Sequence, residues 1–313
     1  MTGRSGDAVD GARPVGARLV SPDRRSVRSS WPPVDDNHVE EDPMQAPQVR
    51  VDTLLQGYRL GTNHGEPAFC GVNLVEGLDH SGVLRRIVVD TGHTGLRRTL
   101  LAALRSRGLV ESDVDVVVCT HAHWDHIENL DVFPRAEIIV HRNERRYVKQ
   151  PHPNDFACPR WIDLIFEHFD RRIHEVEEGE VLLPGVEIVD APGHSAGTIA
   201  VTARTSDGLA VISGDSIQNS TVAVERRNAL VFWDEAMANR TVEKLVTLAD
   251  VIYPGHDQAF RIDANNRVEY VQQLELTLSG VSPDHPGLSF DPSPVLAPYV
   301  MPGIDEPPFL DRS

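Results

Sequence analysis

The sequence predicts an α/β fold made of two similar halves packed as a layered sandwich. Three observations favour this fold. Strand-like and helix-like segments alternate from about residue 49 onward, both halves contain strands that lead into a polar loop carrying histidine, and no short-period repeat of the solenoid type is found. The length of 313 residues and the 40% hydrophobic content allow one large domain or two modest ones, with a sizeable core.

Hydrophobic spacing indicates where the elements lie. The segments 72–76 and 84–90 have the composition of neighbouring strands, joined by a polar turn at 79–82. Leucines at helical spacing predict a helix over 94–107, which Gly108 ends. By the same reasoning we expect further strands at 114–119, 136–140, 186–190, 198–203, 209–213 and 251–253, and further helices at 236–248 and 268–278.

Composition divides the chain into three parts. Residues 1–46 are rich in Gly, Pro, Arg, Ser and Asp and have no hydrophobic period, so we expect a disordered extension, within which Met44 offers an alternative start of translation. Residues 47–280 carry the alternating pattern and form the expected folded domain. Residues 281–313 are rich in proline, which excludes regular helix and predicts a tail.

Charge and cysteine content restrict the partners and the compartment. With 47 acidic and 30 basic residues the net charge is −17, which disfavours nucleic acid held on a broad basic surface. No apolar run approaches the roughly 20 residues that span a bilayer, and no secretory signal is recognisable. Three separated cysteines without a CxxC pattern suit a reducing compartment. We therefore expect a cytoplasmic protein without nucleic-acid or membrane partners.

A short stretch from Thr120 to His126 concentrates groups that bind metal. It contains His121, His123, Asp125 and His126, and it follows the β-branched run 114–119, which has the character of a buried strand. Neutral imidazole and carboxylate are both ligands for Zn²⁺ and other first-row divalent ions. A loop directly after a buried strand places such ligands on a rigid support, so the sequence predicts a metal site here.

Four other segments share one pattern, in which a strand is followed by a small-residue turn and then by a ligand-type side chain. They are 89–93, 191–194, 212–215 and 253–256, which end at His93, His194, Asp215 and His256. A glycine in each turn lets the backbone bend sharply at the strand end, so that the neighbouring side chain can face a shared cavity. His93 is the ambiguous member, because it could equally cap the helix that starts near Thr94, and we favour that structural role.

With these residues in view, the chain resembles the metallo-β-lactamase-fold superfamily over about Val49 to Asp263. The superfamily's HxHxDH motif and its later His, Asp and His match residues at the usual order and approximate spacing. The resemblance implies an αβ/βα four-layer sandwich with two mixed sheets between helices. It further implies a first metal on His121, His123 and His194, a second metal on Asp125, His126 and His256, and Asp215 as the bridging ligand. Asp90 would support the metal loop without binding metal.

The implied chemistry is hydrolysis by two Zn²⁺ ions per chain. A hydroxide shared by the two ions is a strong nucleophile near pH 7, because each ion lowers the pKa of the water. Asp125 and Asp215 are the candidate catalytic carboxylates, and Asp215 could pass a proton to the leaving group. Manganese, iron and cobalt suit the same ligands.

Within the superfamily the chain is most similar to the N-acyl homoserine lactonase group, in the segments 138–144, 191–198 and 253–257. That resemblance implies a small ester substrate, above all a lactone, and a homodimer. One position departs from it: those lactonases carry Tyr three residues after the bridging Asp, where this chain has Gln218. Thioester and phosphodiester substrates, or a non-catalytic metal-binding module, therefore stay open as alternatives.

Aromatic residues and the remaining histidines complete the candidates. The segment from Tyr147 to Phe169 is polar, aromatic and interrupted by proline, so we expect a lid over the site. Aromatic side chains that could line or cover the pocket are Trp124, Tyr147, Phe156, Trp161, Phe166, Phe232 and Trp233. Histidines expected to have only structural roles are His38, His64, His80, His141, His152, His168, His174 and His285.

Overall fold

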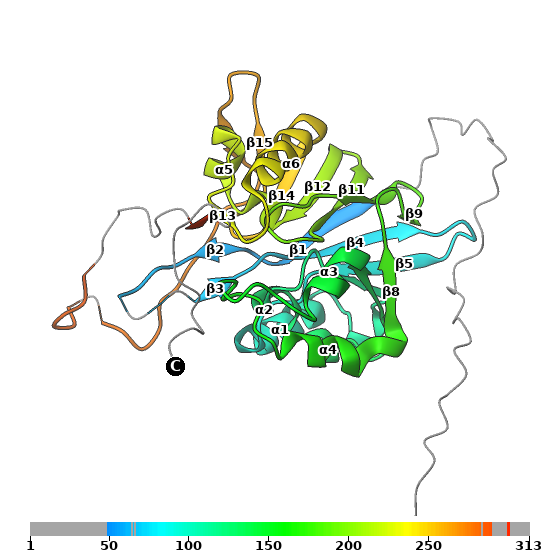
Figure 1. Ribbon diagram of the computed structural model, residues 1–313, viewed down its shortest axis with the longest axis horizontal. Helices are drawn as coiled ribbons and strands as arrows, with labels where there is room; N and C mark the ends of the chain where they lie inside the picture. The colour runs from blue at the N-terminus through cyan, green and yellow to red at the C-terminus, as the bar shows by residue number, and fades with distance from the viewer. Residues whose placement is uncertain (1–48, 64, 66, 283, 290–298, 301–313) are drawn as a thin grey trace, which may run out of the picture. The chain divides into compact units, whose positions relative to one another are not determined.

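The computed structural model describes residues 49–63, 65, 67–282, 284–289 and 299–300 (Figure 1). The expected extension at 1–46 and much of the proline-rich tail lie outside these residues. The described chain begins with Val49, which pairs with Thr205 of the second half through an isolated bridge. In the part of the chain that is described, no helix combines the length and the apolar character needed to cross a bilayer.

The first half forms a six-stranded mixed sheet in the order β1-β4-β5-β6-β7-β8. Its first three strands pair antiparallel, whereas β5 to β8 run parallel. β6 is buried along its whole length, as expected for an apolar, β-branched strand in the middle of a covered sheet. The strands are β1 (Arg50–Leu55), β4 (Val72–Leu78), β5 (Leu84–Val89), β6 (Val116–Val118), β7 (Glu137–His141) and β8 (Ile173–Val176).

The second half forms a seven-stranded sheet in the order β16-β15-β14-β12-β11-β10-β9. Here β12 and β14 pair in parallel, and the other neighbours pair antiparallel. The strands are β9 (Val181–Leu183), β10 (Val186–Asp190), β11 (Ile199–Thr205), β12 (Gly208–Gly214), β14 (Val251–Pro254), β15 (Phe260–Ile262) and β16 (Val268–Tyr270). Two short pairs stand apart from the sheets, β2 (Tyr58–Arg59) with β3 (Ala68–Phe69) and β13 (Leu230–Val231) with β17 (Tyr299–Val300).

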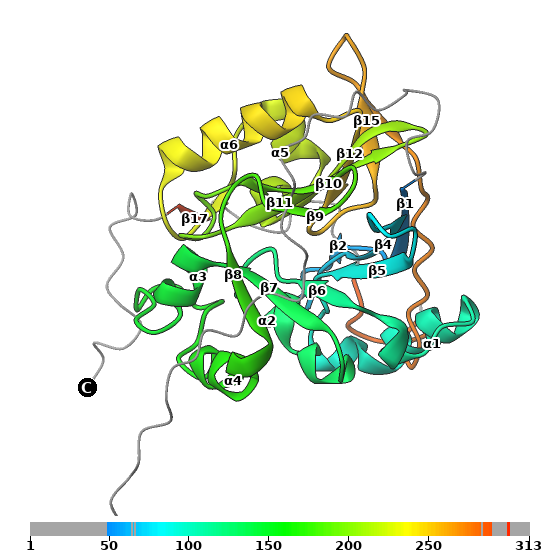
Figure 2. The same cartoon turned by 90° about the vertical axis from the view of Figure 1, so that its right-hand side faces the viewer.

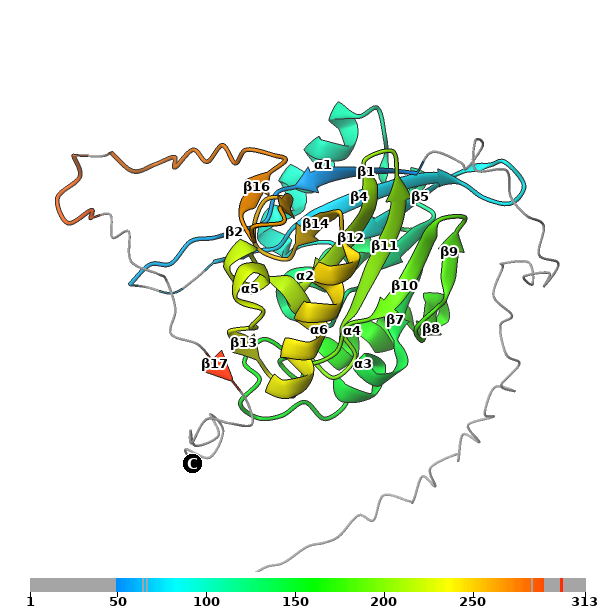
Figure 3. The same ribbon diagram turned by 90° about the horizontal axis from the view of Figure 1, so that it is seen from above.

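Helices cover the outer faces of the two sheets and complete four layers. Figures 1 and 2 show α1, α2 and α4 outside the first sheet, α5 and α6 outside the second, and α3 at a level between the two sheets. Figure 3 shows α6 lying across β11 and β12. The helices are α1 (Arg97–Ser106), α2 (Trp124–Ile127), α3 (Arg142–Tyr147), α4 (Ile162–Phe169), α5 (Ser220–Glu225) and α6 (Glu235–Leu248). The expected α/β four-layer sandwich of two mixed sheets is confirmed.

Local signals explain where two of these helices begin. Asp234 caps α6 by accepting a hydrogen bond from the Met237 N–H at 2.6 Å. The helix expected over 94–107 starts as a 3₁₀ turn at Thr94–Leu96 and continues as α1. His93 precedes this turn, and its Nδ1 accepts from the Gly95 N–H at 3.0 Å. The capping role that we favoured for His93 is thus confirmed.

The prediction of a helix at 268–278 is wrong. Val268–Tyr270 forms strand β16, and 271–278 has no regular structure. A tight turn decides this: the Asp263 side chain accepts from the N–H groups of Asn265 and Arg267, and the returning chain pairs with β15. Leu276 and Leu278 are 44% and 47% exposed, so the apolar spacing has no buried surface to pack a helix against.

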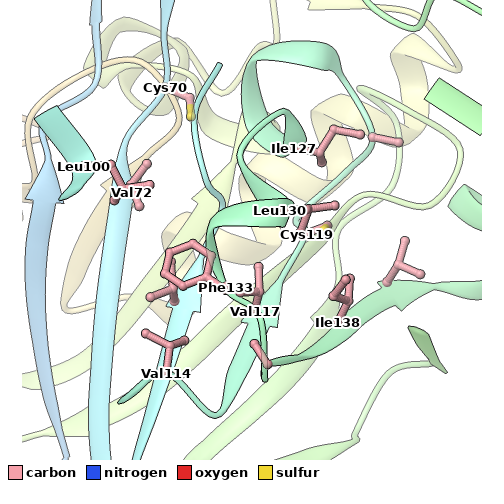
Figure 4. Packing of buried hydrophobic residues seen from close by; sticks show 14 of the residues in the cluster. Cys70, Val72, Leu100, Val114, Val117, Cys119, Ile127, Leu130, Phe133 and Ile138 are labelled. Carbon is pink, nitrogen blue, oxygen red and sulfur yellow. The ribbon is translucent and has the colours of Figure 1, made fainter. Parts of the chain in front are cut away.

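The core of the first half lies between its sheet and α1, α2 and α4. Figure 4 shows Leu100, Val117, Phe133 and Ile138 pointing into it from a helix, a loop and two strands. All four side chains are fully buried. Because β6 lies in this packed layer, the loop that follows it is anchored at its start.

Burial in this core predicts a stability difference between two leucines on helices of the same layer. Leu100 of α1 is 0% exposed and Leu164 of α4 is 63% exposed. We expect Leu100→Ala to lower the free energy of unfolding by about 2–5 kcal/mol, because it leaves a cavity. Leu164→Ala should change it by less than about 0.5 kcal/mol. Urea denaturation measures both, and equal losses would contradict the packing described here.

Candidate metal centre

The expected ligands come from loops at the ends of strands in both sheets. His121 and His123 follow β6, and Asp125 and His126 lie in the short helix α2. On the other sheet, His194 lies between β10 and β11, Asp215 follows β12 and His256 follows β14. Both halves of the sandwich therefore supply groups to one place, and all seven side chains are buried there or nearly so.

These side chains form three overlapping groups whose ligand atoms lie within 4.8 Å of one another. Two groups share His121 and two share His126, so the clusters are continuous. The groups are His121, His123 and His194; His121, His126 and Asp215; and Asp125, His126 and His256. The structure thus brings together all seven residues that sequence reasoning selected, and the first and last of the three groups are the two sets that the resemblance implied.

Asp215 lies between the two sets and has one oxygen toward each. Its Oδ2 is 3.5 Å from His194 Nε2. Its Oδ1 is 3.4 Å from His126 Nε2 and 3.2 Å from His256 Nε2. A turn at Gly255 allows this approach, because a Cβ there would lie 2.0 Å from Asp215 Oδ1. One carboxylate therefore faces imidazoles of both sets at once.

Each imidazole in the cluster directs one ring nitrogen inward and hydrogen-bonds through the other. His121 Nδ1 donates to Thr120 Oγ1 at 3.0 Å, and His194 Nδ1 donates to the Leu230 carbonyl at 2.7 Å. His256 Nδ1 donates to the Phe69 carbonyl at 3.2 Å. Such an outer bond fixes the tautomer and leaves an unprotonated nitrogen for a metal.

Carboxylates hold the other two imidazoles. Asp90 Oδ2 accepts from His126 Nδ1 at 2.8 Å, and Asp155 Oδ2 accepts from His123 Nε2 at 3.4 Å. His123 therefore presents Nδ1 to the cluster, where it lies 3.0 Å from His194 Nε2. Carboxylate–histidine pairs of this kind orient the ring and raise its basicity as a ligand.

Unsatisfied atoms show that the cluster fits a divalent ion. His121 Nε2, His126 Nε2 and Asp215 Oδ1 are buried and have no hydrogen-bond partner. Buried polar atoms are nearly always paired, because a lone one costs the full loss of hydration. Divalent ions bound by these nitrogen and oxygen atoms would remove that cost, and the donor set suits zinc.

Asp90 connects the two ends of the metal loop. Besides His126, its carboxylate accepts from Thr120 N at 2.8 Å and from Thr120 Oγ1 at 2.9 Å. Its φ of 59° is a left-handed conformation that few non-glycine residues adopt. Strain of this kind is retained where the surroundings require one geometry. Asp90 thus supports the loop from outside the ligand sets.

Sequence reasoning missed Glu144, which joins the loops of the two halves. Its fully buried carboxylate accepts from Ala122 N at 2.9 Å, from Ser195 Oγ at 2.8 Å and from Gly197 N at 2.8 Å. Burial raises the pKa of Glu144. A carboxylate shortly after the end of a buried strand was the available signal for it.

Asp155 was also missed, and nothing in the sequence marked it among the polar residues of its segment. Besides its bond to His123, it accepts from Tyr147 Oη at 2.8 Å and from the N–H groups of Ala157 and Cys158 at 3.1 and 3.0 Å. It therefore ties the loop between α3 and α4 to the cluster.

The electrostatics of the cluster favour the neutral, metal-binding form of two of its imidazoles, His121 and His194. Burial lowers the pKa of His121 well below its usual value and that of His194 to about 4, so both rings are neutral at pH 7. Burial alone would raise the pKa of Asp215, but the facing His256 and His126 hold it well below its usual value. Burial alone would also lower the pKa values of His123 and His256, but Asp155 raises the first and Asp215 raises the second, so burial favours the neutral ring at His121 and His194.

A cavity of about 350 Å³ opens beside the cluster. His123, Asp125, Asp215 and His256 line its floor, together with Gln218, whose Oε1 is buried without a partner. Its walls come from the β2–β3 hairpin and from both halves: Tyr58, Arg59, Leu60, Pro67, Ala68, Trp124, Phe156, Ala157 and Leu230. A larger cavity of about 680 Å³ contains none of the seven residues, so size alone does not identify the site.

The aromatic candidates divide among four places. Trp124 and Phe156 line the metal-side cavity, and the Phe232 ring lies 5.0 Å from that of His123. Tyr147 and Trp233 line the larger cavity. Phe166 belongs to the core, and Trp161 is 43% exposed and lines none of the cavities described.

The segment expected to form a lid is therefore only partly at the site. Phe156 and Ala157 reach the metal-side cavity, whereas Ile162 and Phe166 anchor α4 in the core. Of the histidines expected to be structural, those that the structure describes lie outside the three ligand groups.

The chain belongs to the metallo-β-lactamase superfamily, whose family model matches residues 80–256. This confirms the resemblance inferred from the HxHxDH motif. The chain is also 33% identical over 182 residues to human metallo-β-lactamase domain-containing protein 1. That alignment covers 56% of this chain and 59% of the human protein, so the chain spans about three fifths of this relative's length.

Two solved structures show the same fold. A probable metal-dependent hydrolase from Staphylococcus aureus superposes with a TM-score of 0.60 at 15% identity, over 75% of this chain and 100% of that one. A Bacillus thuringiensis protein with N-decanoyl-L-homoserine bound at its active site gives 0.53 at 18% identity, over 68% and 94%. At these identities the likeness concerns the fold alone.

The support that Asp90 gives to His126 predicts a selective loss of metal binding. We expect Asp90→Asn to weaken metal binding about 10- to 100-fold, because the amide loses the charge that orients His126. Competition with a chromogenic chelator measures this change. Asp131→Asn, at an exposed ion pair with Arg97, is the control and should bind metal like the unchanged protein. Equal affinities in both variants would contradict the role of Asp90.

Proposed function

We propose that the protein is a dinuclear zinc-dependent hydrolase that cleaves a small ester, and within that class a lactone. The position of Asp215 is the observation that carries this proposal, because one carboxylate faces both ligand sets within 3.5 Å. His121, His123 and His194 would hold the first ion, Asp125, His126 and His256 the second, and Asp215 would bridge them.

The donor set supports zinc, and manganese, iron or cobalt would suit the same nitrogen and oxygen ligands. When bound, two such ions supply Lewis acidity and a water that ionises near pH 7, which is the nucleophile that ester hydrolysis requires. The neutral state of His121 and His194 keeps their nitrogens available for this binding.

The carboxylates of the chain give the remaining proton chemistry. Asp215 lines the cavity and is the candidate to carry a proton to the leaving oxygen, since its position between the sets brings it to the reacting centre. Asp125 also lines the cavity, and its Oδ2 lies 3.4 Å from His256 Nε2 and 3.5 Å from His126 Nε2. It serves first as a ligand, because the water would already be ionised.

Gln218 is the candidate group for the substrate oxygen. It lies three residues after Asp215, is almost fully buried and lines the same cavity. A side-chain amide carries a donor and an acceptor that exchange places on rotation, so it can offer an N–H to a carbonyl oxygen. Such a donor stabilises the charge that develops on that oxygen during attack.

The cavity supports a small, largely apolar substrate. Its volume of about 350 Å³ lies at the lower end of the usual range for small-molecule sites. Leu60, Pro67 and Phe156 offer apolar surface for an acyl or ring group. The superposed structure that holds N-decanoyl-L-homoserine gives a reason to place lactones first in the substrate panel.

Arg59 in the cavity wall favours one alternative, a phosphodiester, because a guanidinium stabilises an anionic substrate. Thioesters are the other alternative with the same metals. A non-catalytic metal-binding module is a third. Metal analysis followed by a panel of lactones, thioesters and phosphodiesters separates all four: about two ions per chain with turnover excludes the module, and the preferred ester class is read directly.

The bridging position proposed for Asp215 predicts the largest loss of activity from a single substitution. We expect Asp215→Ala to lower kcat/KM by about a thousandfold or more, since it removes a shared ligand and a proton carrier together. Asp263→Asn is the control, because Asp263 lies in an exposed turn and is not one of the clustered residues, so this variant should keep full turnover. Removal of metal by a chelator should abolish activity, and zinc should restore it. Intact turnover in Asp215→Ala would exclude the proposed role.

The position of Gln218 predicts a loss in kcat rather than in metal content. Gln218→Leu keeps a similar size but has no amide, so we expect kcat to fall about 100-fold with two ions still bound. Steady-state kinetics and metal analysis on the same sample measure the two effects. A variant with unchanged kcat would show that Gln218 does not contact the reacting oxygen.

A further inference from the structure

The segment Tyr299–Val300 lies against the loops that build the metal-side cavity. It forms β17, which pairs in parallel with β13 (Figure 3). β13 is adjacent to the metal cluster, because the Leu230 carbonyl accepts from His194 Nδ1 and the Phe232 N–H donates to the His194 carbonyl at 2.9 Å. A residue near the end of the chain thus reaches the site from outside both sheets.

Tyr299 contacts both loops at once. Its N–H donates to the Ala229 carbonyl at 2.8 Å, which fixes it beside β13. Its hydroxyl donates to the Asn154 carbonyl at 2.8 Å, in the loop between α3 and α4. Its ring lies 5.3 Å from the Phe156 ring and 5.4 Å from the Phe232 ring, distances typical of aromatic pairs.

Three consecutive residues of the α3–α4 loop show why this contact matters. Asn154 accepts from the Tyr299 hydroxyl, Asp155 holds His123, and Phe156 lines the cavity. Phe156 remains 52% exposed, so its place in the wall depends on the rings it meets from one side. One of those is Phe232, at 5.1 Å, and another is Tyr299.

We propose that Tyr299 is a positioning residue that holds the α3–α4 loop in place and thereby sets the apolar wall of the metal-side cavity. It acts through Phe156 and so determines which acyl groups fit, whereas the metal sets stay as they are. The consequence for acyl groups rests on the proposed function, but the effect on the loop does not.

The contacts of Asp155 explain why the two effects should separate. Its carboxylate is also held by the Tyr147 hydroxyl and by the N–H groups of Ala157 and Cys158. Asp155 and His123 therefore keep local support when Tyr299 is changed. Phe156 loses one of its ring contacts at the same time, so the wall moves more than the ligands.

Limited trypsin digestion tests the loop without reference to activity. Lys149 and Arg160 are exposed at the two ends of the loop and give cleavage sites there. We expect Tyr299→Ala to speed cleavage at these sites about tenfold, since cleavage follows local opening. Tyr299→Phe keeps the ring but lacks the hydroxyl, and should speed it roughly fivefold.

Kinetics test the effect on the cavity. For a matched pair of acetate and decanoate esters of one alcohol, we expect Tyr299→Ala to raise KM for the decanoate about tenfold while KM for the acetate and the metal content stay unchanged. Trp161→Ala is the control. It removes an aromatic ring from the same segment, but the Trp161 side chain lines none of the cavities described. It should leave the ratio of the two KM values unchanged.

The outcomes distinguish this proposal from the proposed function. Unchanged cleavage in both Tyr299 variants would overturn the positioning role, even in an active enzyme, and so would equal changes in KM for both esters. Faster cleavage in a protein that hydrolyses no member of the substrate panel would support the positioning role and reject the proposed function. If Tyr299→Ala does not fold, the cleavage rate of Tyr299→Phe tests the positioning role in its place.

Discussion

The structure depends on one constraint: five imidazoles and two carboxylates are buried together, and each must be kept in one orientation and one protonation state. Burial lowers the pKa values of His121 and His194 and keeps both rings neutral at pH 7, whereas His256 and His126 hold the pKa of the buried Asp215 well below its usual value. Three buried atoms of the cluster have no hydrogen-bond partner, and bound metal ions would remove the cost of leaving them unpaired. The arrangement of strands, loops and outer carboxylates follows from meeting this requirement.

The two halves of the sandwich meet the requirement jointly. The first sheet supplies the loop after β6, and the second supplies single residues after β10, β12 and β14. Neither half alone supplies all seven clustered residues, so the interface between the halves is the candidate site itself. Glu144 holds that interface by accepting from Ala122 on one side and from Ser195 and Gly197 on the other. The geometry of the site therefore depends directly on how the two halves pack against each other.

The contacts around the cluster are of two kinds, those that orient the imidazoles and those that shape the cavity. Asp90 and Asp155 orient imidazoles, whereas Gln218, Phe156 and the β2–β3 hairpin shape the cavity beside them. The first kind of contact orients the candidate metal ligands, and the second gives the cavity its shape. Tyr299 belongs to the second kind, since it reaches the wall through Phe156 and not through a ligand.

The sequence by itself determined the two halves, eight of the thirteen strands in the two sheets and the seven clustered residues. Short-range signals encode them, because a buried strand, a glycine turn and a ligand-type side chain lie within a few positions of one another. The sequence held no signal for Asp155 or Tyr299, and it marked Glu144 only as a carboxylate after a buried strand, because the contacts of these residues with His123, Phe156 and Ser195 form only when the chain packs. It also predicted a helix at 268–278, where pairing with β15 and the lack of a buried surface decided for a strand and an irregular segment. Tertiary structure alone decided which loops meet, because long-range packing leaves no period in the sequence.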